Sequence, residues 1–187
     1  LNHPCVGMLH DANWWGKTKE MLTLEEVIKS LPDVHFYWAG DGQYKTKILE
    51  VLEKFENFHY LGFLDYPDEV RKYLTEIDIY ALPTGMDTTP LSCRESMSMK
   101  KPIIGTNVGG IPEMIYHQKT GLLVDEGDSQ AWIKSIKLLL DDKELSKKLG
   151  DGARNLVIEK FNWDILAKRF VEIIESSLGE NIKQLNK

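Results

Sequence analysis

The pattern with the clearest chemical use in this sequence is a pair of carboxylates separated by seven residues. Asp87 precedes Thr88-Thr89-Pro90, and Glu95 follows within the next segment. Threonine is a good helix cap and proline a good first residue, so we predict a helix from about residue 91 to 99. Its free N–H groups would cradle phosphate oxygens. Glu95 would accept hydrogen bonds from adjacent sugar hydroxyls, and Asp87 would reach a sugar beyond the phosphates.

Both features also have interpretations that need no ligand. Asp87 would stabilise the helix N-terminus and Glu95 would be a solvated surface residue, and the spacing by itself favours these roles. Lys17 and Lys19 form a small basic cluster that suits one phosphorylated small molecule. They would equally be surface lysines on an ordinary helix, and both interpretations stay open at this point.

Apolar β-rich runs alternate with segments of helical period, which predicts βαβ units around a parallel sheet. Strands are expected at 5–9, 34–39, 58–61, 77–82, 102–105 and 122–124. Helices are expected at 17–30, 44–55, 67–74, 91–99, 111–116, 129–140, 143–160 and 162–178. We therefore predict one α/β domain, a doubly wound parallel sheet with a helical tail. Ligands of such sheets bind at the carboxyl ends of the strands, which selects 7–19, 40–42, 62–63 and 85–95.

The composition argues against several classes of protein. A net charge of −6 argues against nucleic acid as a partner. There is no run of 18 apolar residues, so no membrane span is expected. The five histidines are scattered, and no metal site is predicted. Cys5 and Cys93 lie far apart, which favours a reducing compartment such as the cytoplasm. The chain starts at Leu1 and reaches a strand almost at once, which suggests a fragment.

Several motifs follow one another in a characteristic order. They are 34–42, which ends in Gly-Asp-Gly, then 60–63, 87–97, 101–104, 109–113, 121–124 and 161–163. This series resembles the C-terminal half of the family-4 (group 1) retaining glycosyltransferases, and it covers nearly the whole chain. The resemblance implies one Rossmann-like half of a GT-B fold, with a nucleotide-diphosphate sugar as donor substrate and neither cofactor nor metal. It also implies an N-terminal acceptor-binding domain in the same protein.

The resemblance also implies roles for individual residues. Asp87 would lie beside the transferred sugar as a catalytic residue, together with Lys17, and Glu95 would hold the nucleotide ribose. The other expected donor-binding residues are Gly7, Lys19, Gly62, Phe63, Thr89, Pro90, Leu91 and Ser92. Gly62 and Phe63 would meet the base, and the segment 89–92 would meet the diphosphate.

Three departures from the family pattern keep other functions open. Asp87 replaces the usual glutamate, and Met8 and Trp15 stand where the family has an arginine and a lysine that neutralise the leaving diphosphate. Lys17 or Lys19 would substitute for these cations. A non-catalytic nucleotide-sugar-binding or scaffold subunit is one alternative, and a sugar-nucleotide epimerase or phosphorylase of the same architecture is another.

The expectation for the whole chain, 1–187, is a nucleotide-sugar-binding domain whose final helix, about 162–178, packs toward the acceptor half. This helix carries the apolar side chains of Trp163, Phe170, Ile173, Ile174 and Leu178. The acceptor would be a glycan or a lipid, and any association with the cytoplasmic face of a membrane would run through the acceptor half. The chain by itself is expected to bind donor without multiple turnover.

Overall fold

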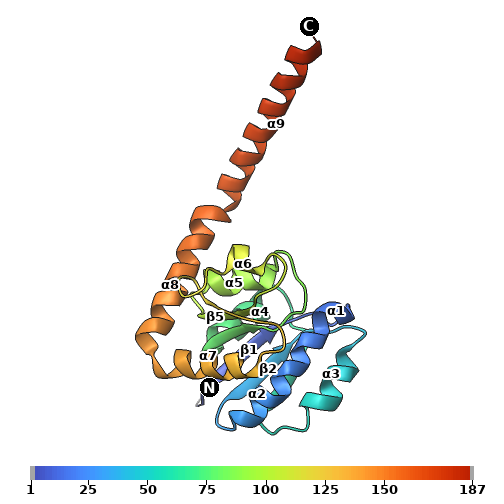
Figure 1. Ribbon diagram of the computed structural model, residues 1–187, viewed down its shortest axis with the longest axis vertical. Coiled ribbons are helices and arrows are strands. Elements are labelled where there is room, and N and C mark those ends of the chain that lie inside the picture. The colour runs from blue at the N-terminus through green and yellow to red at the C-terminus, as the bar shows by residue number, and fades with distance from the viewer. Residues whose placement is uncertain (1–2, 186–187) are drawn as a thin grey trace.

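The computed structural model describes residues 3–185, with side chains for 3–178, and contains a six-stranded, fully parallel sheet (Figure 1). The strands have the order β3-β2-β1-β4-β5-β6. Their bounds are β1 Cys5–Leu9, β2 His35–Ala39, β3 Phe58–Gly62, β4 Ile79–Leu82, β5 Ile103–Thr106 and β6 Leu122–Val124. The predicted doubly wound sheet is confirmed, with the order that reverses between β1 and β4.

Helices connect these strands nearly where the sequence predicts them. They are α1 Trp15–Thr18, the 3-10 helix η1 Lys19–Thr23, α2 Leu24–Ser30, α3 Lys45–Leu52, α4 Asp68–Glu76, α5 Leu91–Ser98, α6 Ile111–Met114, α7 Ser129–Asp141, α8 Lys143–Lys160 and α9 Trp163–Leu185. The predicted helix 17–30 is thus interrupted by a 3-10 stretch. The start of β4 is also later than predicted, because the Ile77 N–H still bonds to the Tyr73 carbonyl at the end of α4.

Each face of the sheet buries its own apolar cluster. One joins the sheet to α2, α3 and α7 and contains Met8, Trp38 and Trp132, all with no exposed surface. The other lies under α4, α5, α6 and α8 and contains Tyr80 and Met97. The strands therefore need apolar residues on both sides, which explains the continuous apolar runs in the sequence.

Gly7 lies inside β1, and side chains of α4 and of the residue after it pack directly against its backbone. A Cβ atom at this position would come within 2.6 Å of the Tyr73 hydroxyl and of the Ile77 side chain. Tyr73 Oη accepts a hydrogen bond from Met8 N (2.7 Å) and donates to Tyr37 O (2.8 Å). The absence of a side chain at Gly7 therefore lets a buried hydroxyl fasten β1 and β2 below their carboxyl ends.

Tyr73→Phe is expected to lower the free energy of unfolding by about 1–3 kcal/mol, because it removes the hydrogen bonds of a buried hydroxyl to Met8 and Tyr37. Urea unfolding followed by circular dichroism measures this change. The control is Tyr116→Phe, whose hydroxyl accepts a hydrogen bond from the exposed Lys160 ammonium (2.8 Å). This control is expected to cost less than about 1 kcal/mol. Equal losses in the two variants would contradict the structural role of Tyr73.

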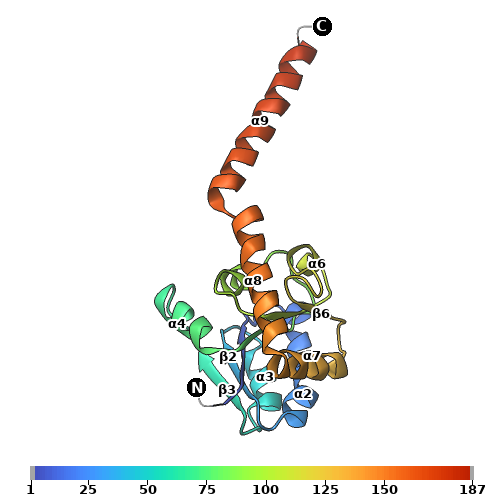
Figure 2. The same cartoon turned by 90° about the vertical axis from the view of Figure 1, so that its left-hand side faces the viewer.

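The last helix leaves the α/β body. Figures 1 and 2 show α9 continuing beyond α8 as a rod that extends away from the sheet in both views. Its apolar side chains are exposed, among them Trp163 (83%), Phe170 (65%) and Ile173 (62%). Within residues 3–185, no helix has both the length and the apolar character that crossing a bilayer requires.

Candidate donor-binding cleft

A cleft of about 780 Å³ opens at the carboxyl ends of β1, β2 and β4. This is the edge where the strand order reverses and where ligands of doubly wound sheets bind. The lining residues come from the ends of these strands, from the segment after β3, and from α1, α4 and the start of α5. They are Leu9, His10, Asp11, Asn13, Lys17, Ala39, Gly40, Asp41, Gly42, Phe63, Leu64, Val70, Asp87, Pro90, Leu91, Ser92 and Glu95.

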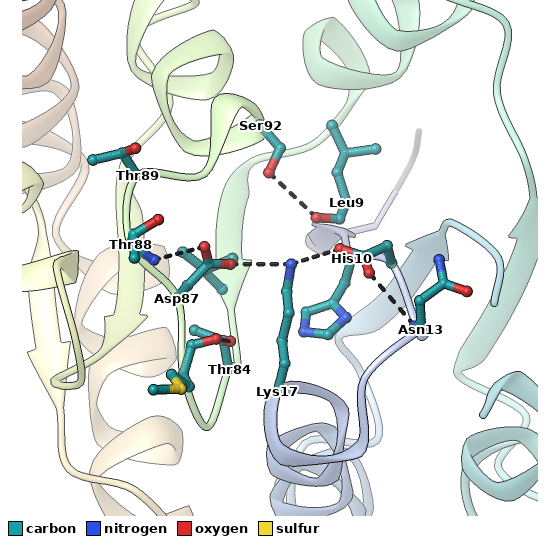
Figure 3. A network of polar contacts seen from close by, with 12 residues as sticks. Leu9, His10, Asn13, Lys17, Thr84, Asp87, Thr88, Thr89 and Ser92 are labelled. Carbon is teal, nitrogen blue, oxygen red and sulfur yellow. Dashed lines mark hydrogen bonds and ion pairs between the residues drawn. The ribbon is translucent and has the colours of Figure 1, made fainter. Parts of the chain in front are cut away.

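Lys17 and Asp87 meet across this cleft (Figure 3). The Lys17 ammonium lies 3.0 Å from Asp87 Oδ2 and 2.6 Å from Asp11 Oδ2. The side chains of Lys17 and Asp87 are only 18% and 14% exposed. The structure thus joins the two residues that the sequence analysis named as catalytic, and it adds a second carboxylate, Asp11.

The two carboxylates determine the protonation of the lysine. Burial disfavours the ammonium, but its contacts with Asp11 and Asp87 outweigh burial and raise the pKa of Lys17. The same ion pair lowers the pKa of Asp11 against the opposing effect of burial. Lys17 is therefore a firmly charged cation at neutral pH, and an anionic ligand would exchange carboxylate contacts for phosphate contacts.

The loop that carries Asp87 is held on several sides. Thr84 Oγ1 donates to Met86 O (3.0 Å), and Gly110 N donates to Asp87 O (2.9 Å). Asp87 Oδ1 accepts from Thr88 N (2.9 Å). The Asp87 carboxylate is thus oriented before any ligand arrives, with Oδ2 turned toward Lys17.

Glu95 lies in α5 and contributes its carboxylate to the same cleft. Its Oε1 atom is buried and has no hydrogen-bonding partner within the described part of the chain. Burial raises the pKa of Glu95, although Tyr66 and Arg94 act in the opposite direction. A ligand with neighbouring hydroxyl groups would supply the missing donors and stabilise the charged carboxylate.

The start of α5 differs in detail from the prediction. Pro90 is the N-cap residue, and no side chain caps the helix, so the expected threonine cap is wrong. Thr89 is exposed, and its carbonyl accepts from Arg94. The Ser92 hydroxyl accepts from Tyr80 (2.8 Å) and faces Leu9 O (3.4 Å). Phosphate binding here would therefore depend on the first backbone N–H groups of α5 more than on hydroxyl side chains.

The Gly40-Asp41-Gly42 segment directly follows β2, and it supports the loop after β1. Ala12 N donates to Asp41 O (2.9 Å), and Tyr44 N donates to Ala12 O (2.9 Å). A Cβ atom at Gly40 would come within 2.0 Å of the His10 carbonyl. The glycines thus allow two backbone segments to lie close together at the rim of the cleft.

Four of the predicted donor-binding residues are not among the lining residues of the cleft. Gly7 is covered by Tyr73, as described above. The exposed Lys19 forms an ion pair with Glu126 (3.0 Å), so Lys17 and not Lys19 is the lysine in the cleft. Gly62 accepts from Gly40 N (2.8 Å) beside the rim, while the exposed Phe63 next to it lines the cleft. Thr89 is the fourth.

The polar cleft residues His10, Asp11 and Asn13 were not named individually in the sequence analysis. They directly follow β1, and they lie within the segment 7–19, which the sequence analysis had selected as a candidate ligand-binding segment. Trp15, which stands at the position of a family lysine, turns away from the cleft and packs against Tyr44 with ring centroids 5.5 Å apart.

Comparison with known proteins identifies the family to which this chain belongs. The family described as "Glycosyl transferases group 1" matches residues 5–142. The chain belongs to the group 1 glycosyl transferases. It is 32% identical over 149 residues to N-acetyl-alpha-D-glucosaminyl L-malate synthase of Bacillus anthracis, covering 80% of this chain and 39% of that protein. It is 31% identical over 151 residues to sulfoquinovosyl transferase SQD2 of Arabidopsis thaliana, covering 79% and 29%.

The chain therefore spans less than half the length of these group 1 relatives. Its fold matches the C-terminal domain of a group 1 family protein, LpcC, from Francisella tularensis, with a TM-score of 0.72, 20% identity, and coverage of 86% of this chain and 87% of that one. Anabaena Alr3699/HepE, solved in complex with UDP-glucose, matches with a TM-score of 0.80, 18% identity and coverage of 94% and 49%. The predicted half of a GT-B fold is confirmed.

Proposed function

We propose that this chain binds the nucleotide-diphosphate sugar of a retaining glycosyltransferase. Together with an acceptor-binding domain, it would transfer that sugar to an acceptor such as a glycan or a lipid. The observation that supports this most directly is the joint presence of Asp87, Glu95 and Lys17 in one cleft around the start of α5. Membership in the group 1 family supports the same reaction class.

The chemistry of the lining residues suggests how a donor would lie. Its diphosphate would meet Lys17 and the N–H groups at the start of α5, which carry partial positive charge. The sugar would lie beside Asp87, and the ribose hydroxyls would bond to the unpartnered Oε1 of Glu95. The base would lie along Phe63. Cationic and dipolar groups at the diphosphate would then stabilise the charge that develops on the leaving group.

The departures from the family pattern do not remove positive charge from this cleft. Met8 is fully buried in the core and Trp15 packs toward Tyr44, but Lys17 lies in the cleft and contacts Asp87. The position of Lys17 favours a donor-activating site over a scaffold subunit that has lost its cation.

Thermal unfolding in the presence of UDP, GDP, ADP and their sugars tests donor binding. A ligand that prefers the folded state raises the midpoint temperature in a concentration-dependent way. A shift with one nucleoside diphosphate and its sugar is expected. No shift with any of the three up to millimolar concentration would refute the donor-binding function.

Glu95→Ala is expected to weaken binding of the preferred nucleoside diphosphate by at least about tenfold. Hydrogen bonds to a charged group contribute about 1.5–3 kcal/mol each, and about 1.4 kcal/mol corresponds to one factor of ten. Isothermal titration calorimetry measures the affinity. Glu50→Ala removes an exposed carboxylate from α3 and serves as the matched control. Unchanged affinity in Glu95→Ala would remove Glu95 from the site.

We also propose that α9 packs against the acceptor-binding domain. Its support is the exposed apolar surface formed by Trp163, Phe170, Ile173 and Leu178, which the α/β body leaves uncovered. Such a surface is costly to leave in water and marks an interaction site. The proposed location of the protein is the cytoplasm or the cytoplasmic face of a membrane. Any contact with lipid would be made by the acceptor-binding domain.

A further inference from the structure

The lining of the cleft is unexpectedly acidic for a site that takes an anionic ligand. Among the described residues that line it, four carboxylates face one ammonium, that of Lys17. Two of the carboxylates, Asp11 and Asp87, already hold this ammonium. A diphosphate that enters must therefore compete with them, and a further positive charge near Lys17 would be needed to balance it.

His10 lies where that charge is needed. It follows the last residue of β1, lines the cleft and is 3% exposed. Figure 3 shows its imidazole beside the Lys17 side chain. Neither ring nitrogen makes a hydrogen bond to any described residue. Burying two polar atoms without partners costs free energy, which a ligand with acceptor oxygens would recover.

The backbone around His10 holds the ring in this place. His10 N donates to Ala39 O (3.1 Å), and His10 O accepts from Trp38 Nε1 (2.9 Å). Gly40 packs directly against the same carbonyl. The imidazole is therefore part of the rigid wall of the cleft and not a side chain on a free loop.

The charges that face His10 come from three segments. Burial lowers the pKa of His10 to about 4, and the Lys17 ammonium from α1 acts in the same direction. Asp11 in the same loop and Asp87 in the loop after β4 act in the opposite direction. Before a donor binds, the imidazole is thus neutral at pH 7. A diphosphate adds negative charge beside the ring and favours its protonated form.

We propose that His10 is a second cationic contact of the donor diphosphate, neutral before binding and protonated by one proton from solvent when the diphosphate binds. This inference rests on the proposed donor-binding function. It adds a second positive charge beside Lys17 when the diphosphate is bound, and it makes donor affinity depend on pH. The proton returns to solvent when the nucleoside diphosphate leaves.

Calorimetric titration with UDP, and in parallel with GDP and ADP, tests the proposal at pH 7 in PIPES and in Tris. These buffers differ in ionisation enthalpy, so the difference in binding enthalpy gives the protons taken up per site. The terminal phosphate also titrates at a pKa of about 6, so the comparison with His10→Gln isolates the contribution of His10. On binding, the wild type is expected to take up as much as one proton more per site than His10→Gln. The variant is expected to bind the nucleotide several-fold more weakly.

The sign of the pH effect follows from linkage. Affinity of the wild type should rise by up to about tenfold per pH unit as pH falls through the bound-state pKa of His10, relative to His10→Gln. His59→Gln is the matched control. Its ring lies in a stack with His35 and Tyr37 and is not among the cleft-lining residues, and it is expected to behave as wild type.

NMR of the wild type keeps the test independent of how the variants fold. Addition of the nucleotide at pH 7 should move the His10 ring ¹⁵N resonances from the neutral to the imidazolium range. Nucleotide binding with equal proton uptake in wild type and His10→Gln, or with a His10 ring that stays neutral, would overturn the proposal and leave donor binding intact. No binding of UDP, GDP or ADP would overturn both.

Discussion

Replacing Lys17 by methionine is expected to weaken binding of the preferred nucleoside diphosphate by about tenfold to a hundredfold. A charge-assisted contact of about 1.5–3 kcal/mol is lost with the ammonium. In addition, Asp11 and Asp87 lose the cation that they share at 2.6 and 3.0 Å, so the phosphates would face two unpaired carboxylates. Calorimetric titration of wild type and variant at low ionic strength measures the loss.

Two variants separate the role of Lys17 from a change in net charge. Lys17→Arg keeps a cation at the site and should retain part of the affinity. Lys29→Met removes an exposed lysine of α2 and should leave the affinity within about twofold of wild type. If Lys17→Met and Lys29→Met bound equally well, the lysine in the cleft would have no direct part in phosphate binding.

Gly109→Ala is expected to disturb the site without changing any charge. Gly109 has φ +53°, and a Cβ atom there would lie 2.1 Å from the Asp87 carbonyl oxygen. The left-handed backbone costs about 1–2 kcal/mol for alanine, and overpacking adds about 1–3 kcal/mol. The loop that carries Asp87 must shift, so we expect lower stability and at least about tenfold weaker nucleotide binding. Urea unfolding and calorimetry measure the two effects.

Gly127→Ala is the matched control for this substitution. Gly127 also has positive φ, +75°, but nothing lies within 4 Å of a Cβ atom at that position. It should therefore show the backbone cost with no loss of nucleotide affinity. A Gly109→Ala protein that binds as tightly as Gly127→Ala would mean that the position of the Asp87 loop is unimportant for the donor.

An arginine at position 8 is a less informative test of the same chemistry. Met8 is fully buried in the apolar cluster with Trp38 and Trp132, so a side chain at this position does not reach the cleft. Met8→Arg would place a charge among apolar side chains, and its effect on folding would obscure any effect on catalysis. Only the packing of β1 shows that the side chain at position 8 is buried in the core.

Much of the fold was predictable because it depends on local pattern. The parallel strands are apolar on both faces and the helices show a 3.6-residue period, so β1, β6 and α8 have the predicted bounds. The errors occur where tertiary contacts override the pattern. The strand β4 starts later than predicted because the Ile77 N–H still bonds to the Tyr73 carbonyl at the end of α4. The helix α5 begins at Leu91, with Pro90 and not a threonine as its N-cap residue.

The sequence by itself determined the parallel α/β class and the family resemblance, because these depend on residue order and spacing, and the resemblance selected Asp87 and Glu95 as candidate site residues. Only the tertiary structure decided which of two lysines enters the cleft: Lys17 contacts Asp87, while Lys19 pairs with Glu126. The tertiary structure also shows that Gly7 packs against Tyr73 and does not line the cleft, whereas His10 does line it. The physical reason is that direction and burial of a side chain depend on neighbours distant in sequence, which spacing along one chain cannot encode.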